Sequence, residues 1–255
     1  MPGISACIVS YGGFEEVRDA AQSVLRHTQQ RPLTLYLVDN ASPDGTGQKL
    51  KETDFGPTAQ VICLEQNVGF GSGHNQVLHQ LHSDYHFVLN PDILVEEDVL
   101  CQICDWMDQH PDVVMATPSL CFPDGRPQIL PKRKPNVLGL LARQGIGCLK
   151  KYGDHYAMLD EDLTQSIDIQ FCTGSFFCIR TQAFQQMGGF DEGYFMYVED
   201  ADITQKALQH GRVCYLPQFR AIHAWHRAPS RHMSSFLMQL KSMGRYFHKW
   251  GFSWK

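Results

Sequence analysis

Short apolar runs rich in β-branched residues alternate with segments of helical periodicity along the first 118 residues of this 255-residue chain. The first run covers residues 4–11, and apolar side chains then recur at helical spacing within residues 15–28. Further strands are predicted at residues 33–40, 60–67, 85–92 and 113–118, with helices at residues 47–53, 72–81 and 96–109. Such an alternation is typical of a mostly parallel sheet with helices on both faces. The predicted fold class is therefore α/β.

The pattern changes after residue 118. A hairpin is predicted about the Asp-Gly pair at residues 124–125. Residues 130–168 are rich in proline, glycine and charge, and we interpret them as a long surface loop with some helix. Residues 169–180 are predicted as a strand, residues 181–187 and 200–210 as helices, and residues 213–217 and 221–225 as short extended pieces.

Composition and cysteine usage indicate the compartment. Hydrophobic residues make up 43% of the chain, enough for a substantial core. The N-terminus has no basic segment followed by an apolar stretch and a cleavage site, and no window approaches 18 uninterrupted apolar residues. The nine cysteines, an odd number, indicate reduced thiols. We therefore expect a cytoplasmic protein.

Charge is distributed unevenly along the chain. Nine of the 22 Lys and Arg residues, and none of the 27 Asp and Glu residues, lie from Lys206 onward. An acidic body is suited to metal ions, whereas a basic end is suited to a pyrophosphate or an anionic membrane. Nucleic acid is not expected as a partner, because no recognisable nucleic-acid module accompanies the basic residues.

Polar residues follow several predicted strands at their carboxyl ends, where sheets of this class bind ligands. These residues are Ser10, Tyr11, Asp39, Asn40, Asn67, Asn90 and Asp92. Neither G-x-G-x-x-G nor a G-x-x-x-x-G-K-[ST] loop is present, which disfavours a dehydrogenase or a P-loop protein. Asp92 could hold Mg²⁺ or Mn²⁺ together with phosphate oxygens, and His223 could add an imidazole.

Three carboxylates, Glu199, Asp200 and Asp202, follow directly on the aromatic and apolar run 195–198. The first two are expected at the start of a helix, where free N–H groups stabilise anions. The apolar run should also desolvate Asp200 in part and raise its basicity. The alternative is that Asp200 only caps the helix and that Glu199 is solvated. The residues alone leave both interpretations open.

Seven motifs occur in a fixed order along the chain: "IVSYGG", "VDNASPDGT", "NVGFGSGHN", "LNPD", "CTGSFFCIR", "GGFDEGYFMYVEDADIT" and "HAWHRAPS". Together they resemble the inverting family-2 glycosyltransferases of the GT-A fold, most closely the bacterial rhamnosyltransferase-like branch. Two features depart from the broad family. The Asp-x-Asp metal motif is here Asn90-Pro91-Asp92, which leaves one carboxylate for the metal, and the basic stretch 132–134 with the segment to residue 168 matches no family motif. Acceptor choice is expected to lie there.

The resemblance implies a role for each matching residue. The nucleotide-binding residues would be Ser10, Tyr11, Asp39, Asn67, Gly69, Asn75 and Asp92. Asp92, assisted by His223, would hold Mn²⁺ or Mg²⁺ on the donor diphosphate. Asp200 of the catalytic pair with Glu199 would be the general base, and Arg227 or Arg231 could stabilise the leaving phosphate.

The implied reaction moves a sugar from a nucleoside diphosphate donor to a hydroxyl of a glycan or a polyprenyl-diphosphate-linked glycan in bacterial surface polysaccharide synthesis. The first choice of donor is dTDP-L-rhamnose, and the second is a UDP-hexose or a UDP-N-acetylhexosamine. A sugar-nucleotide pyrophosphorylase is disfavoured because "SYGGFEE" lacks a loop rich in Gly, Arg and Lys. A non-catalytic nucleotide-sugar-binding protein is a further alternative, which the intact Asp92, Glu199, Asp200 and His223 disfavour.

Three regions follow from this interpretation: a nucleotide-sugar-binding half at residues 1–118, an acceptor-binding and catalytic half of the same domain at 119–230, and a basic amphipathic helix at 231–255. One stripe of that helix carries Phe236, Leu240, Met243, Phe247 and Trp250, and its basic flank carries Lys241, Arg245 and Lys249. The helix either packs on the domain or rests, with residues 132–134, on the anionic inner face of the cytoplasmic membrane.

Overall fold

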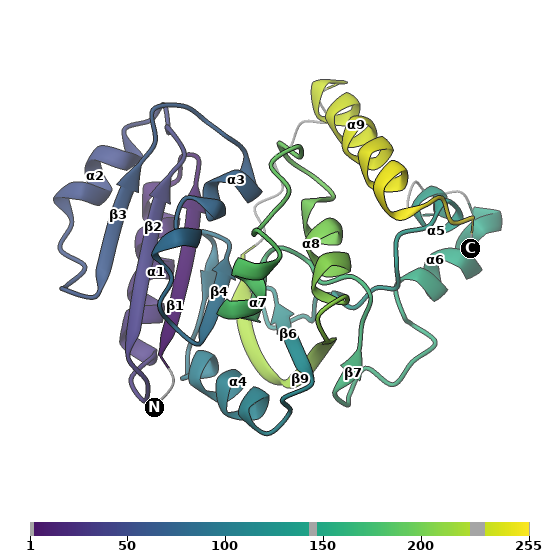
Figure 1. Ribbon diagram of the computed structural model, residues 1–255, viewed down its shortest axis with the longest axis horizontal. Coiled ribbons are helices and arrows are strands. Elements are labelled where there is room, and N and C mark those ends of the chain that lie inside the picture. The colour runs from purple at the N-terminus through teal and green to yellow at the C-terminus, as the bar shows by residue number, and fades with distance from the viewer. Residues whose placement is uncertain (1–2, 143–146, 225–232, 255) are drawn as a thin grey trace.

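The computed structural model describes residues 3–142, 147–224 and 233–254. Within these ranges the strands are β1 (Ile4–Ser10), β2 (Leu33–Asp39), β3 (Ala59–Cys63), β4 (Tyr85–Leu89), β5 (Ile93–Leu94), β6 (Val113–Cys121), β7 (Ile167–Asp168), β8 (Phe176–Arg180) and β9 (Arg212–His223). They form one sheet in the order β3-β2-β1-β4-β8-β6-β9-β5, and β7 pairs with β9 (Figure 1).

The first four long strands are parallel neighbours, as predicted. They are connected through α1 (Phe14–His27), α2 (Thr46–Glu52) and α3 (Phe70–Asn75). The predicted helix at 72–81 is instead α3 followed by the 3₁₀ turn η1 (Leu78–Gln80). Because β1 and β2 are in parallel register, their carboxyl-terminal residues Ser10 and Asp39 lie side by side.

The strand predicted at 169–180 is shorter than expected. Strand β8 begins at Phe176 and runs antiparallel between β4 and β6. Ile169 N still donates to Val213 O of β9 at 2.9 Å, but the donors that follow are used elsewhere: Cys172 N donates to Thr204 Oγ1 at 3.1 Å, and Gly174 N donates to Asp200 Oδ2 at 3.3 Å. The sheet is therefore mixed: β1 to β4 pair in parallel, and β8 is antiparallel to both of its neighbours.

The two extended pieces predicted at 213–217 and 221–225 are one continuous strand, β9, up to His223. It runs parallel to β6 with a register shift between Pro118 and Ser119. Ser119 Oγ donates to the carbonyl oxygens of Pro217 and Phe219 at 3.2 and 2.9 Å, so its side chain spans the irregularity. The strand therefore continues where the sequence pattern is interrupted.

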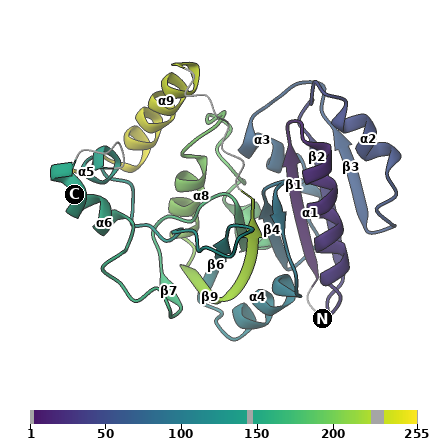
Figure 2. The same cartoon turned by 180° about the vertical axis from the view of Figure 1, so that it is seen from behind.

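The helices of the second half are α4 (Val99–Asp108), α5 (Val137–Ala142), α6 (Lys150–Tyr156), α7 (Thr181–Gln186), α8 (Glu199–Ala207) and α9 (Met233–Trp250), with a 3₁₀ turn η2 (Gly147–Leu149). The described residues of the predicted loop at 130–168 thus include two short α-helices, which agrees with the predicted presence of some helix. Helices α5, α6 and α9 gather at the end of the molecule opposite β3 (Figures 1 and 2). The predicted hairpin at 124–125 is confirmed by a hydrogen bond from Phe122 N to Arg126 O at 2.9 Å.

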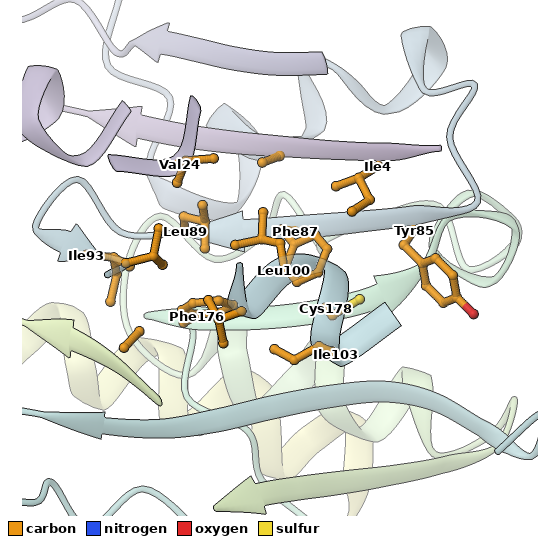
Figure 3. Close-up of a cluster of buried hydrophobic side chains, with 14 of the residues drawn as sticks. Ile4, Val24, Tyr85, Phe87, Leu89, Ile93, Leu100, Ile103, Phe176 and Cys178 are labelled. Carbon is orange, nitrogen blue, oxygen red and sulfur yellow. The ribbon is translucent and has the colours of Figure 1, made fainter. Parts of the chain in front are cut away.

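Helices pack on both faces of the sheet, as predicted. On one face, Val24 of α1 and Leu100 and Ile103 of α4 pack against Phe87 and Phe176 of the strands (Figure 3). On the other face a second buried cluster joins α3, α7 and α8 to the sheet. Among the described residues, no helix combines the length and the apolarity needed to cross a bilayer.

Candidate active site

The ends of β1 and β2 form a polar edge of the sheet. Ser10 and Asp39 are register partners, with exposed fractions of only 2% and 4%. In the described part of the chain, Ser10 Oγ and Asp39 Oδ1 have no hydrogen-bond partner. Because buried polar atoms in proteins are normally paired, two such atoms side by side mark a place for a polar ligand. Tyr11, the next residue, is exposed.

Gly69 connects this edge to the segment that precedes Glu199. Its carbonyl oxygen accepts a hydrogen bond from Asn40 Nδ2 at 3.1 Å, and Val68 N donates to Asn40 Oδ1 at 2.9 Å. On the other side, a Cβ at Gly69 would lie 2.2 Å from Phe195 O, and the Gly69 φ is +90°. Only glycine allows both the approach and the dihedral angle. Asn40 is one of the polar residues noted at the strand ends, but the family resemblance assigned it no role.

The two asparagines predicted for the nucleotide pocket make local and packing contacts. Asn67 Oδ1 accepts from Gly69 N at 2.9 Å, which shapes the loop itself. Asn75 binds the backbone of Phe190 through both amide atoms, at 2.9 and 3.0 Å. Asn75 therefore holds α3 against the segment after α7.

Asp92 and His223 come together, as the metal prediction requires. His223 Nε2 lies 3.3 Å from Asp92 Oδ1 and 3.5 Å from Asn90 Nδ2. Strand β9 ends at His223, and Ala224 N donates to Asp92 O at 3.1 Å, so backbone pairing sets the distance between these side chains. The described residues bring no third carboxylate, imidazole or thiol into a cluster with this pair.

A cavity of about 530 Å³ is lined both by residues of the predicted metal site and by the carboxylate pair. His223 and Asn90 line one part of it, and Glu199 and Asp200 line another, with Thr173, Gly174 and Ser175 also in the wall. The cavity therefore joins the imidazole next to Asp92 to the carboxylate pair.

Glu199 and Asp200 follow a strained backbone. Tyr197 and Val198 have φ values of +70° and +69°, an unusual conformation for residues other than glycine and particularly for β-branched valine. Such strain is maintained only when surrounding contacts impose it, and it is concentrated at functional sites. Helix α8 starts directly afterwards at Glu199.

Burial changes the acidity of both carboxyl groups. Desolvation, reinforced by the charge of Asp200, raises the pKa of Glu199 to about 8. Desolvation also raises the pKa of Asp200, opposed by the charge of Lys132 and by hydrogen bonds from Gly174 N and Ala201 N. The predicted desolvation of Asp200 is confirmed. The alternative of a solvated Glu199 is wrong, because this side chain is only 8% exposed.

The third carboxylate, Asp202, makes tertiary contacts with helix α9. Its side chain is completely buried and accepts hydrogen bonds from Trp250 Nε1 at 2.7 Å and Lys249 Nζ at 2.9 Å. Both partners lie at the end of α9. Asp202 therefore fastens the terminal helix to α8, a role that we did not infer from sequence.

Helices α5, α6 and α9 supply an apolar wall to the cavity. Leu140, Tyr156, Met243, Tyr246 and Phe247 line it from these helices. Lys132 lines it as well, with its Nζ 4.7 Å from the ring centroid of Phe171. No sequence motif indicates that Lys132 lies near Glu199 and Asp200.

Most of the basic groups proposed to face a membrane form ion pairs or hydrogen bonds within the protein. Arg133 pairs with Asp160 at 2.6 Å and also with Glu161. Lys134 Nζ donates to Trp250 O at 3.0 Å. In α9, Arg245 and Lys249 both pair with Asp191, at 2.7 and 2.9 Å.

Only part of the predicted stripe of α9 is packed on the domain. Met243, Phe247 and Trp250 are half-buried, whereas Leu240 is 48% exposed. The side chain of Phe236 lies outside the described residues, as do Arg227 and Arg231. The helix thus packs on the domain and leaves another edge, which includes Leu240 and Lys241, in solvent.

Two solved structures define the class of fold. A crystal structure of GalNAc-T7 with UDP, GalNAc and Mn²⁺ matches with a TM-score of 0.75 at 17% identity over 98% of this chain. The mannosyltransferase PcManGT from Pyrobaculum calidifontis with GDP-Man and Mn²⁺ matches with a TM-score of 0.64 at 15% identity over 97%. The chain spans 49% and 64% of these two proteins. These likenesses confirm the predicted GT-A fold.

The sequence profile of glycosyl transferase family 2 matches residues 5–188, and the chain belongs to that family. It is 26% identical over 215 residues to an N-acetylglucosaminyl-diphospho-decaprenol L-rhamnosyltransferase of Mycobacterium tuberculosis, covering 79% of this chain and 69% of the relative. It is 29% identical over 192 residues to the rhamnosyltransferase WbbL of Escherichia coli, covering 69% and 70%. The predicted family and its rhamnosyltransferase-like branch are confirmed.

Proposed function

We propose that this protein is an inverting glycosyltransferase that moves L-rhamnose from dTDP-L-rhamnose to a hydroxyl of a lipid-linked diphosphate glycan. The observation that carries the proposal is the single cavity that joins Asp200 to His223 and thereby to Asp92. The rhamnosyltransferase names of the relatives, one of which includes a diphospho-decaprenol acceptor, support the choice of donor and acceptor.

In this proposal Glu199 and Asp200 have different protonation states: Glu199 is the protonated acid, and Asp200 is the ionised base. With a pKa of about 8, Glu199 holds a proton near neutral pH. Desolvation raises the pKa of Asp200 as well, but the charge of Lys132 and the two backbone donors oppose this rise and favour the ionised form. Neighbouring carboxyl groups whose environments separate their pKa values commonly divide the two roles in this way. Asp200 is then the group that accepts the proton of the acceptor hydroxyl as that oxygen attacks the anomeric carbon.

The donor end of the cavity fits a divalent cation. Two neighbouring ligands of an octahedral Mg²⁺, each about 2.1 Å from the metal, are about 3 Å apart. Asp92 Oδ1 and His223 Nε2 are 3.3 Å apart and provide one oxygen and one nitrogen. These residues would hold Mn²⁺ or Mg²⁺, which when bound neutralises charge on the donor diphosphate. Phosphate oxygens would complete the coordination.

The nucleoside would occupy the polar edge at Ser10 and Asp39. Both have a buried oxygen available for a ligand hydrogen bond, and the exposed ring of Tyr11 offers a flat apolar surface beside them. The acceptor would occupy the part of the cavity walled by α5, α6 and α9. This division keeps leaving group and attacking hydroxyl on opposite sides of the sugar, as inversion requires.

A panel of nucleotide sugars tests the proposal. The protein is incubated with dTDP-L-rhamnose, UDP-hexoses or UDP-N-acetylhexosamines, with Mn²⁺ or chelator and with or without a lipid-linked N-acetylglucosamine acceptor. We expect nucleoside diphosphate release that is fastest with dTDP-L-rhamnose and acceptor and that chelator abolishes. A preference for a UDP-sugar would replace the donor, while release from none of them, together with tight nucleotide binding, would favour a non-catalytic binding protein.

Because the proposed acceptor is anchored in a lipid, we also propose peripheral contact with the inner face of the cytoplasmic membrane. The free edge of α9, with Leu237, Leu240 and Lys241, is the surface that supports it. Apolar side chains beside a basic group are typical of helices that lie in a membrane interface.

A further inference from the structure

Gln128, in the segment that follows β6, contacts His223 twice. The Gln128 side chain is only 4% exposed. Its Nε2 lies 2.8 Å from the carbonyl oxygen of His223, and its Oε1 lies 2.9 Å from His223 Nδ1. The two residues are separated by 95 positions in the sequence. Gln128 therefore holds both the backbone and the ring of His223.

The first contact determines the orientation of the amide. A backbone carbonyl oxygen can only accept, so the atom that faces His223 O must be the Gln128 amide nitrogen. The other amide atom, facing the ring, is then the oxygen, which can also only accept. It follows that His223 Nδ1 carries a proton. The orientation of an amide and the tautomer of a histidine are both assigned in this way, from the donors and acceptors of the surrounding hydrogen-bond network.

A neutral imidazole with a proton on Nδ1 has its lone pair on Nε2. That nitrogen is the atom that lies 3.3 Å from Asp92 Oδ1. A metal-binding histidine usually donates its other ring N–H to a fixed acceptor, which sets the tautomer and the orientation of the ring. The position of Gln128 corresponds to that acceptor.

We propose that Gln128 is a positioning residue that fixes His223 in the Nδ1–H tautomer and directs Nε2 toward a divalent cation shared with Asp92. The inference rests on the proposed function for the cation itself. The proton on Nδ1, however, is assigned from the contacts between Gln128 and His223, which involve neither a metal nor a substrate. It can therefore be tested without a metal or a substrate.

A merely structural role for Gln128 predicts a different dependence on the side chain. To anchor its segment to β9, the hydrogen bond from Nε2 to the His223 carbonyl is sufficient, whereas control of the tautomer requires the oxygen. Gln128→Glu keeps an acceptor for Nδ1–H but removes the donor to the backbone. Gln128→Met removes both, and Gln128→Asn keeps the amide but shortens its reach.

The experiment has two readouts. Long-range ¹H–¹⁵N spectra of the ¹⁵N-labelled protein, with the His223 signals assigned from a His223→Gln variant, report the tautomer without metal. Manganese titration followed by electron paramagnetic resonance, in the presence of thymidine diphosphate, reports cation affinity. Gln185→Met is the matched control, because Gln185 donates to Leu78 O and Leu81 O at 3.2 and 3.0 Å without contacting His223.

We expect Gln128→Met and Gln128→Asn to lose the single Nδ1–H pattern of His223 and to bind Mn²⁺ about 10- to 100-fold more weakly. Gln128→Glu should keep the pattern, and Gln185→Met should match the wild type in both readouts. Retention of the Nδ1–H pattern in Gln128→Met, or in Gln128→Asn if the methionine variant does not fold, overturns the proposal. Failure of the wild type to bind Mn²⁺ would instead count against the proposed metal site, and the spectra would still decide the role of Gln128.

Discussion

The indole N–H of Trp250 donates to Asp202 Oδ1 at 2.7 Å and joins the last turn of α9 to the first turn of α8. Lys249 Nζ donates to the other oxygen of the same carboxylate at 2.9 Å. Helix α8 begins with Glu199 and Asp200, and α9 supplies Met243, Tyr246 and Phe247 to the cavity wall. The contact therefore couples the position of the apolar cavity wall to that of Glu199 and Asp200.

Removing the indole donor should loosen this coupling. Trp250→Phe keeps the aromatic packing but leaves Asp202 Oδ1 with only the longer hydrogen bond from Tyr194 Oη at 3.3 Å, and hydrogen bonds to charged groups contribute about 1.5–3 kcal/mol. We expect the free energy of unfolding, measured in urea, to fall by about that amount. Trp254→Phe is the control, since Trp254 is 64% exposed and should change stability by less than about 0.5 kcal/mol. Equal stabilities of the two variants would contradict the role of the contact.

Asp200 and Glu199 should respond differently to conversion into amides. Asp200→Asn removes the proposed proton acceptor, so transfer should fall by roughly 10²-fold or more while donor binding is little changed. Glu199→Gln resembles the protonated acid that a pKa of about 8 implies, so transfer at pH 7 should be nearly retained. Steady-state rates with saturating donor measure both. The reverse pattern would assign the base role to Glu199.

Glu199 should also make stability depend on pH. Its pKa is about 8 in the folded chain against an ordinary value of 4.5, so between these values the folded state binds more protons than the unfolded state. Stability therefore falls as pH rises through this window, by up to about 1.4 kcal/mol per pH unit from this group. Glu199→Gln should abolish this contribution. In urea titrations the variant should be more stable than the wild type at pH 8 and equally stable near pH 4, and a constant difference across the range would be inconsistent with a buried, protonated Glu199.

The close approach of Gly69 to Phe195 can be tested by comparison with a second glycine that has a similar backbone conformation. At Gly69 an added Cβ would lie 2.2 Å from Phe195 O, whereas Gly56, with a φ of +82°, has no atom within 4 Å of an added Cβ. Gly56→Ala should lose about 1–2 kcal/mol of stability from the left-handed backbone alone. Gly69→Ala should lose more and should also reduce transfer, because Phe195 must move and Glu199 follows a few residues later. Thermal unfolding and transfer rates measure the two effects, and equal losses in both variants would show that the close approach has no consequence.

The parts of the fold predicted correctly are those with local causes. The apolar runs of β1, β2 and β4 and the periodicity of α1 reflect residues near one another in sequence. The direction of β8 had no such signal, because a short buried strand looks the same whether its neighbour is parallel or antiparallel. The helices α5 and α6 were predicted only as some helix within a long loop, without bounds, because Gly139 and Gly153 interrupt their short sequences.

In the candidate site, too, the residues identified from sequence are those with a local sequence signal. Asp92, His223, Glu199 and Asp200 were identified through ordered motifs, and the structure brings them to one cavity and its edge. Gln128, Lys132 and Asp202 were missed in their present roles because those roles arise only from tertiary contacts. Gln128 meets His223 across 95 residues, and Asp202 meets Trp250 across 48. Nothing in the local sequence around them indicates those partners.

The last prediction concerns the free edge of α9. Leu237 and Leu240 are 58% and 48% exposed, and Lys241 is exposed beside them. Arg245 and Lys249 are unsuitable for a membrane test because both pair with Asp191. Lys241→Glu should instead weaken binding to anionic vesicles, since each basic group near such a surface contributes about 1 kcal/mol.

Co-sedimentation with vesicles of anionic and of neutral lipid measures the effect. We expect Lys241→Glu to bind anionic vesicles roughly fivefold more weakly or worse, because it replaces attraction by repulsion. Leu240→Ser should weaken binding to both lipids, because it removes apolar area that would be buried in the interface. Arg26→Glu, a reversal at an exposed position at the end of α1, should leave binding unchanged. If Lys241→Glu and Arg26→Glu bind anionic vesicles equally, the edge of α9 is an ordinary solvated surface, and an acceptor that reaches the cavity from solution becomes the better explanation.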